Sequence, residues 1–204
     1  MKKRFVYYSY YNSGQLMIVG GAHNTFVYNS NRYRSWLWGQ NSYGGLGDNT
    51  TNNRSSPVSL VGTKKTFCQI GCGNWHGLGI DENGLIWGWG YNNYGQVGDN
   101  SVTCTSTPVS KLGGKKTFCV ISNGAGYNSL ATEYSGTMFA WGRNDVGQLG
   151  DNSVVCRSTP VQVYYGVGGG LECAVSLAVG GTRSMGLSNT GQIWCWGSNT
   201  KGQI

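Results

Sequence analysis

The chain has 204 residues, with 35 glycines, 13% aromatic residues and only 11% charged residues, whereas globular proteins contain about 25% charged residues. Disordered segments are charged and poor in aromatic residues, so the composition excludes an ordinary disordered chain and favours a turn-rich all-β protein. No segment approaches the roughly 20 consecutive apolar residues of a transmembrane helix, so we expect no membrane span.

The segment 1–37 begins with basic residues followed by apolar and aromatic ones, as a secretion signal does. A signal peptide needs an uninterrupted apolar stretch of about 7–15 residues, and polar residues between Ser9 and Gln15 interrupt this one. The segment therefore contains no convincing signal peptide. Faint echoes of the later repeats indicate that 1–37 is a degenerate first repeat.

A motif that begins with Trp-Gly recurs along the rest of the chain. It reads W-G-Y-N-N-Y-G-Q-V-G-D-N from Trp89, returns from Trp38 and Trp141, and is cut short from Trp196. Successive motif tryptophans are 51, 52 and 55 residues apart, and repetition at this period indicates a solenoid, a propeller or an array. We predict one incomplete domain over 1–204, with further repeats at 38–88, 89–140, 141–195 and 196–204.

One repeat unit, taken in chain order, predicts four short strands. The apolar run 67–70 and the alternating segment 76–80 are typical of strands. The segment 81–84 ends in Asn-Gly, the strongest short hairpin signal, and 85–89 is the return strand. Pro108 then marks a short outer strand, because proline is tolerated at a sheet edge.

The pattern W-G-x-N-x-x-G-Q-L-G, preceded by G-x-x-H and by turns at Asn83-Gly84 and Thr190-Gly191, resembles the regulator of chromosome condensation repeat. The resemblance runs from about Ile18 to Ile204. It implies a seven-bladed β-propeller of four-stranded antiparallel blades. Because only about four blades are present, we expect a fragment, a partial ring, or a half that closes by self-association.

The motif tryptophans are large enough to pack between neighbouring sheets. The glycine after each one permits backbone conformations or close approaches that other residues cannot adopt. The motif asparagine can cap a turn through its side-chain amide. We therefore assign a structural role to the following pairs: Trp38 and Gly39, Trp89 and Gly90, Trp141 and Gly142, and Trp196 and Gly197.

Seven cysteines and two histidines are the only soft metal ligands. Cys68, Cys72 and His76 have tolerable ligand spacing, but Cys68 recurs as Cys119 without a second cysteine nearby. Structural zinc sites usually need two ligand pairs, so we predict no metal site and interpret these cysteines as small core residues. His23 and His76 both fit the G-x-x-H position, where we expect buried, turn-stabilising side chains.

No set of residues typical of catalysis is visible. The eight acidic residues are dispersed, mostly in repeated turns, and neither a nucleophile motif nor a phosphate-binding loop is present. We therefore predict a non-enzymatic protein without a cofactor. The odd number of cysteines mildly favours a reducing compartment, although the sequence does not fix the localisation.

The net charge of +7 is the strongest signal outside the motif. Paired lysines recur at equivalent positions and are predicted to lie on one rim: Lys64, Lys65, Lys115 and Lys116. Such a rim would attract an acidic protein surface or an anionic glycan through a field that salt screens. Nucleic acid is not favoured, because the basic residues follow no recognised nucleic-acid-binding motif.

The sequence favours a non-catalytic propeller that binds a macromolecular partner, preferably a protein, through its loops. Fixed glycines hold variable positions whose residue types suit adaptable binding surfaces. The candidate contacts are Tyr43, Tyr91, Tyr94, Arg143, Asp145 and Lys201. Two alternatives remain open: a structural or adhesive component of a bacterial or phage assembly, with a virion as its location, and a guanine-nucleotide exchange factor for a small GTPase.

Overall fold

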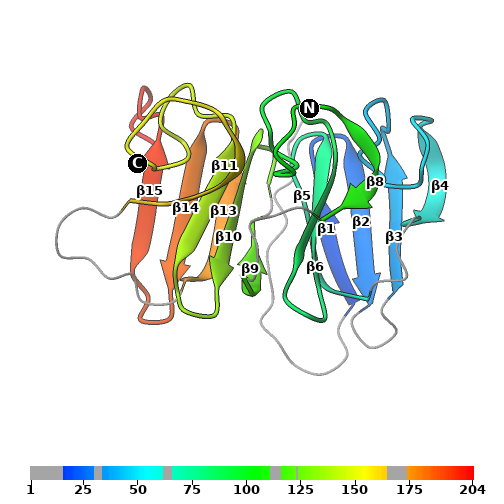
Figure 1. Ribbon diagram of the computed structural model, residues 1–204, viewed down its shortest axis with the longest axis horizontal. Helices are drawn as coiled ribbons and strands as arrows, with labels where there is room; N and C mark the ends of the chain where they lie inside the picture. Colours follow the sequence, from blue (N-terminus) through cyan, green and yellow to red (C-terminus); the bar gives the residue numbers. More distant parts are fainter. Residues whose placement is uncertain (1–15, 30–33, 62–65, 111–115, 123, 165–173) are drawn as a thin grey trace.

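The computed structural model describes residues 16–29, 34–61, 66–110, 116–122, 124–164 and 174–204. These residues form only strands, turns and loops, in four antiparallel sheets that we call blades 1 to 4 (Figure 1). Blade 1 consists of β1 (Leu16–Gly20), β2 (Asn24–Asn29), β3 (Arg34–Gly39) and β4 (Arg54–Ser59). Blade 2 consists of β5 (Phe67–Cys72), β6 (His76–Asp81), β7 (Ile86–Gly90) and β8 (Thr105–Val109).

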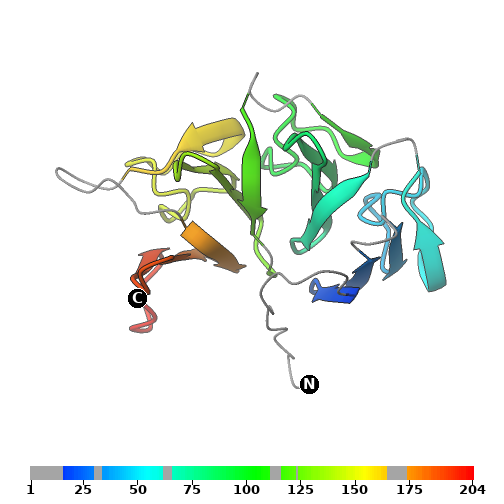
Figure 2. The ribbon, with the colours of Figure 1, turned by 90° about the horizontal axis from the view of Figure 1, so that it is seen from below.

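The remaining blades repeat this order along the chain. Blade 3 consists of β9 (Phe118–Ile121), β10 (Asn128–Glu133), β11 (Met138–Gly142) and β12 (Arg157–Gln162). Blade 4 consists of β13 (Ala174–Gly180), β14 (Arg183–Ser188) and β15 (Ile193–Gly197). Seen along the axis, the blades spread as a fan with their first strands near the centre (Figure 2). The predicted all-β propeller of about four blades is confirmed.

The predicted strands and hairpin of blade 2 are confirmed as β5 to β8. The hairpin between β6 and β7 forms because Asp81 Oδ1 accepts hydrogen bonds from the main-chain N–H groups of Asn83 and Leu85, at 2.9 and 3.0 Å. Gly84 completes the turn with a φ of 75°, a conformation that favours glycine.

Apolar clusters fill the junctions between consecutive blades. Leu37 of blade 1 packs with Ile70 and Trp89 of blade 2, and Leu78 of blade 2 packs with Trp141 of blade 3. A third cluster joins blades 3 and 4. Trp89 and Trp141 have no exposed surface, so the predicted packing of the motif tryptophans between sheets is confirmed for these two.

Each junction also contains hydrogen bonds from one blade to the next. The indole Nε1 of Trp89 donates to the carbonyl oxygen of Gly45 at 3.0 Å, and that of Trp196 donates to the carbonyl oxygen of Gln148 at 3.0 Å. Ser184 Oγ donates to the same Gln148 carbonyl at 2.6 Å. These groups are main-chain or rigid side-chain atoms, so they fix the angle between blades as well as their separation.

A buried polar side chain at the start of the second strand extends this network. Asn128 Nδ2 donates to Ser184 Oγ at 2.8 Å, and His76 Nε2 lies 3.0 Å from Ser129 Oγ. Because Ser129 uses its single hydroxyl proton to donate to Gln96, His76 must donate through a protonated Nε2. Burial lowers the pKa of His76 to about 4, so the ring is neutral near pH 7.

The motif loops are held by the side-chain amides that the sequence indicated. Asn92 Oδ1 accepts from the N–H of Val97 at 2.8 Å, and its Nδ2 donates to Asp99 at 3.2 Å. Asn100 adopts a φ of 63° and donates its N–H to the carbonyl oxygen of Ser158 in the next blade. Each loop therefore closes on itself and is fastened to the following blade.

Two predictions about buried side chains are wrong. Cys68 is exposed and Cys119 is half-buried, because each follows the core phenylalanine of its strand and lies on the opposite side of the sheet from it. His23 is also exposed. The residue paired like His76 in blade 1 is Asn24, since Asn24 lies opposite Gly39 as His76 lies opposite Gly90.

Candidate functional site

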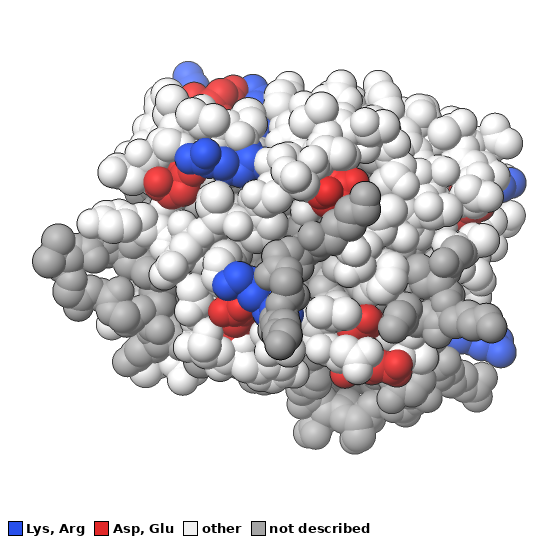
Figure 3. Space-filling view, viewed as in Figure 1, with Lys and Arg blue, Asp and Glu red and all other residues white. Residues whose placement is uncertain are grey.

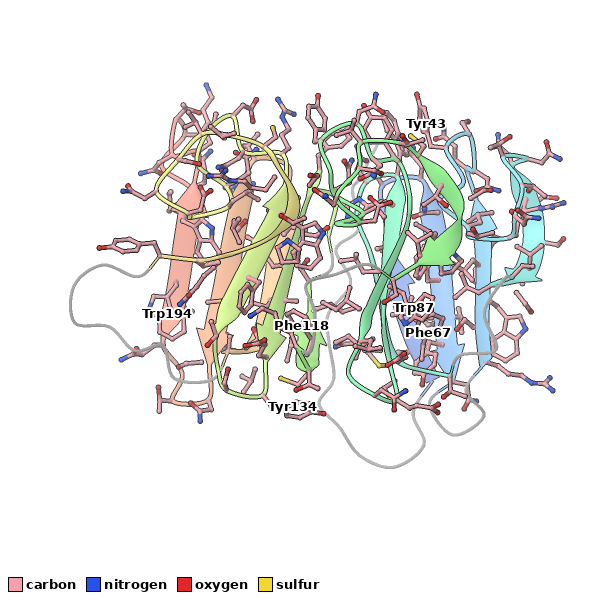
Figure 4. All side chains as sticks on the ribbon, viewed as in Figure 1. Tyr43, Phe67, Trp87, Phe118, Tyr134 and Trp194 are labelled. Atoms are coloured by element: carbon pink, nitrogen blue, oxygen red, sulfur yellow. The ribbon has the colours of Figure 1, made fainter. Side chains whose placement is uncertain are left out.

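Six aromatic side chains from the first three blades form one continuous group at the end of the propeller where the motif loops lie, and Tyr43 marks this end in Figure 4. Tyr43 is 39% exposed and lies 4.8 Å from Tyr91 and 5.3 Å from Trp75, measured between ring centroids. We call the group the aromatic cluster, and its members are His23, Tyr43, Trp75, Tyr91, Tyr94 and Tyr127.

Trp75 and Tyr91 lie at the middle of the aromatic cluster. Trp75 stacks on His23 at 5.7 Å and contacts Tyr127 edge-on at 5.7 Å. Tyr91 contacts both Tyr94 and Tyr127 edge-on, at 6.3 and 5.9 Å. Edge-on and stacked pairs at these separations stabilise one another by about 0.5–1.5 kcal/mol beyond burial, so the rings form a preorganised surface.

The strands and loops place these rings in a repeated way. Trp75 and Tyr127 each come directly before a buried residue that begins a second strand, and Tyr91 follows Gly90 at the end of β7. The main-chain carbonyl of Trp75 accepts the N–H of Tyr91 at 2.9 Å. Gly90 permits this approach, because a Cβ atom there would lie 2.5 Å from the Trp75 carbonyl oxygen.

Arg143 borders the aromatic cluster on the blade 3 side. Its guanidinium carbon lies 5.4 Å from the Tyr94 ring centroid and 5.9 Å from that of Tyr127, within range of a cation–π interaction. Arg143 Nη2 also donates to Asp145 Oδ2 at 2.5 Å. This bond raises the pKa of Arg143 and lowers that of Asp145, so both remain charged and largely neutralise each other.

The aromatic cluster is partly withdrawn from water although its rings stay accessible. Burial raises the pKa of Tyr91, and the neighbouring Tyr94, Tyr127 and Tyr43 hydroxyls raise it further. Tyr91 is therefore a neutral hydrogen-bond donor at physiological pH. The surface combines apolar ring area with phenol and amide groups and carries almost no net charge.

Five of the predicted contact residues meet at this surface: Tyr43, Tyr91, Tyr94, Arg143 and Asp145. Lys201 lies on the corresponding loop of blade 4, where it is exposed and adjoins none of the rings described above. The sequence interpretation missed His23, Trp75 and Tyr127. Aligning the repeats on the residue that begins each second strand would have placed these three at one equivalent position.

The predicted lysine rim is only partly within the described structure, since Lys64, Lys65 and Lys115 lie outside the described residues. Lys116 Nζ is 3.3 Å from Glu133 Oε1 and 4.0 Å from the Phe139 ring centroid. Glu133 adjoins Tyr134, which Figure 4 shows at the opposite end from Tyr43. On the face shown in Figure 3, basic side chains lie beside acidic ones, so no basic patch extends over it.

Metal and membrane features were also considered from the sequence. Within the described ranges, no group of three or more His, Cys, Asp or Glu side chains is placed to hold a metal ion. Cys68 is exposed whereas Cys72 is buried, so these two do not face a common site. No helix with the length and hydropathy needed to cross a bilayer occurs in the described part of the chain.

The fold and the loop-end surface thus define a β-propeller whose blades present a preorganised aromatic surface. The regulator of chromosome condensation (RCC1) repeat matches residues 34–80, 83–130 and 135–187, and a second form of this repeat matches 67–96 and 174–203. The chain therefore belongs to the regulator of chromosome condensation repeat family.

Two characterised relatives align with most of the chain. The human E3 ubiquitin-protein ligase HERC2 is 30% identical over 188 residues, which are 90% of this chain and 4% of HERC2. The ultraviolet-B receptor UVR8 of Arabidopsis thaliana is 24% identical over 190 residues, which are 93% of this chain and 42% of UVR8. The chain thus spans less than half the length of either relative.

Two solved structures share the fold. Human WBSCR16 superposes with a TM-score of 0.76 at 24% identity, over 90% of this chain and 47% of that one. Yeast RCC1 (Prp20), solved bound to Kap60, superposes with a TM-score of 0.74 at 17% identity, over 94% of this chain and 45% of that one. At these identities the likeness supports the fold.

Proposed function

We propose that this chain is a non-catalytic propeller that binds a protein partner through the aromatic cluster and Arg143. The observation that carries the proposal is the continuous contact of rings from three blades at the loop end, from His23 to Tyr94. Tyrosine, tryptophan and arginine are the residues that contribute most binding energy at protein interfaces. Their concentration at one accessible surface therefore favours macromolecular recognition.

The physical properties of the surface suit a neutral or weakly polar protein epitope. The rings already contact one another, so binding orders few additional side chains and loses little conformational entropy. Arg143 is neutralised by Asp145 at 2.5 Å, which makes a purely electrostatic partner less suitable. The family relationship supports the same class of function, since yeast RCC1 (Prp20) was solved bound to Kap60.

The test is capture of protein partners on the immobilised chain, followed by cross-linking that maps the contact residues. We would compare the native chain with a variant in which Tyr43, Tyr94 and Arg143 are alanine. The proposal expects at least a tenfold loss of the captured partner, since each hot-spot truncation costs about 2 kcal/mol or more. Cross-links in the native complex should map to the aromatic cluster.

A matched control replaces two exposed tyrosines elsewhere, Tyr134 and Tyr164, by alanine. This control should retain the partner, and both variants should melt within a few degrees of the native chain. Equal capture by the native chain and the triple variant would refute this surface as the binding site. Acceleration of nucleotide release from a small GTPase, retained in the triple variant, would instead support the exchange-factor alternative.

A further inference from the structure

Blade 4 exposes an apolar sheet face that its counterparts bury. Met185, Leu187 and Ile193 are 42%, 37% and 67% exposed. Each lies on the side of the sheet that, in earlier blades, faces the next blade along the chain, which we call the trailing face. The blade 2 residues at the same registers are Leu78, Ile80 and Ile86, all buried in the cluster shared with blade 3.

Blade 1 exposes the opposite side of its sheet, which we call the leading face. Ile18 is 54% exposed, and Trp36 and Trp38 are each partly exposed. At the same registers, blade 2 has Ile70, Trp87 and Trp89, which pack against blade 1. The exposed faces of blades 1 and 4 are therefore the two halves of the apolar interface that recurs between neighbouring blades.

The polar groups of the junction are divided between the same two faces. In blades 2, 3 and 4 the motif tryptophan donates to a carbonyl of the preceding blade, but among the described residues Trp38 Nε1 has no acceptor. Thr25 supplies a hydroxyl at the register of Ser129 and Ser184. Trp38 and Thr25 thus present two donors without their acceptor.

Blade 4 carries the complementary groups. Arg183 lies opposite Gly197 as Asn128 lies opposite Gly142, so it is placed to donate to a hydroxyl of a following blade. Gln203 follows Trp196 at the same interval at which Gln148 follows Trp141, and its carbonyl is the counterpart of the Gln148 carbonyl. The unpaired acceptor on blade 4 therefore matches the unpaired donors on blade 1.

We propose that the trailing face of blade 4 binds the leading face of blade 1 in a second copy of this chain. The interface is heterologous, because different surfaces of the two copies meet, and such interfaces close into rings when the rotation permits. Two copies provide eight blades, within the range of about 4–8 blades of known propellers. The chain also covers 47% of the solved WBSCR16 chain, so two copies approach the length of one such protein.

The test is the native mass of the purified chain by light scattering over a range of micromolar concentrations. The proposal expects a species of twice the 22.0 kDa chain mass. Met185→Asp on the trailing face and Ile18→Asp on the leading face should each abolish this species, because each places a charge in an apolar interface. Both side chains are exposed in a single copy, so circular dichroism should show that each variant stays folded.

Mixing the two variants tests the head-to-tail arrangement directly. A copy with Met185→Asp keeps its leading face, and a copy with Ile18→Asp keeps its trailing face, so one intact interface should form and the doubled mass should return. The control Val154→Asp changes a residue of similar exposure, 65%, outside both faces and should associate like the native chain. A native mass of one chain, or association that survives Met185→Asp, would overturn the proposal.

Discussion

The indole Nε1 of Trp141 donates a 2.9 Å hydrogen bond to the main-chain carbonyl oxygen of Gln96 in the preceding blade. Trp141 is fully buried, so this bond is shielded from water and joins two sheets at a fixed point. The same tryptophan fills the apolar junction between blades 2 and 3. One side chain thus provides both the packing and the direction of the contact.

Trp141→Phe should destabilise the protein by about 2–3 kcal/mol, from the lost hydrogen bond and the cavity left by the smaller ring. Urea unfolding followed by circular dichroism measures the change. Trp194→Phe removes a similar volume from a half-buried indole that makes none of these junction bonds, and should cost less than about 1 kcal/mol. Equal losses in both variants would show that the Gln96 bond contributes nothing.

The stability of the chain should fall as the pH decreases from 6.5 towards 4. Burial lowers the pKa of His76 to about 4, whereas an unfolded histidine titrates near 6.5. Between these values the unfolded chain binds a proton that the folded chain does not, so protonation favours unfolding by up to about 1.4 kcal/mol per pH unit. His76→Asn, which imitates Asn128, should flatten melting temperature against pH; an unchanged slope would exclude His76 as the titrating group.

Thr105→Arg should stabilise blade 2. Arg54 and Arg157 pair with Asp48 and Asp151 at 2.7 and 2.9 Å, and Thr105 occupies the same register opposite Gly90. The new guanidinium would reach Asp99 and add up to about 1 kcal/mol at low salt, or roughly 2–4 °C in melting temperature. The gain should shrink at high salt, and a gain that salt does not change would indicate another cause.

The two native ion pairs already bias their carboxylates. Burial alone would raise the pKa of Asp48, but hydrogen bonds from Thr50, Arg54 and Asn41 outweigh it and hold the pKa below its ordinary value. Asp151 is lowered in the same way by Ser153, Arg157 and Asn144. Their stabilisation is present above the unfolded pKa near 3.8 and is lost as the pH falls below it, outside the range assigned to His76.

Gly77→Ala should destabilise the chain by about 3 kcal/mol, near the upper limit for overpacking a core. A Cβ atom at Gly77 would lie 2.2 Å from Cε2 of the buried Trp89 ring, which has no room to move. Gly180→Ala is the matched control, because its Cβ atom would meet only Arg183 Nη2, at 3.9 Å. Comparable unfolding free energies for both variants would contradict this account.

The sequence was a reliable guide wherever the repeat itself carried the signal. The strands of blade 2, the Asn83-Gly84 turn and the burial of Trp89 depend on local periodicity and glycine chemistry, which recur in each unit. The position of His23 was predicted wrongly because Gly20 and Gly21 are adjacent and the motif was counted from the first. The structure counts from Gly21, whose N–H bonds to the carbonyl of Asn24.

The aromatic cluster was only half predictable for a different reason. Tyr43, Tyr91 and Tyr94 lie at variable positions inside the motif, where the sequence directs attention. Trp75 and Tyr127 precede the second strands of different blades, and their contacts with the motif tyrosines depend on the angle between sheets. That angle follows from the junction hydrogen bonds and packing between blades, which no single repeat contains.

The junction between blades 1 and 2 differs from the others in lacking a hydroxyl. Gly77 stands where Ser129 and Ser184 stand in later blades, and both amide atoms of the buried Asn24 side chain lack a partner. In a protein whose units contact only their neighbours, the weakest contact sets where the array opens first. Amide hydrogen exchange should therefore be fastest along this seam, and blade 1 should detach as a unit before the other three separate.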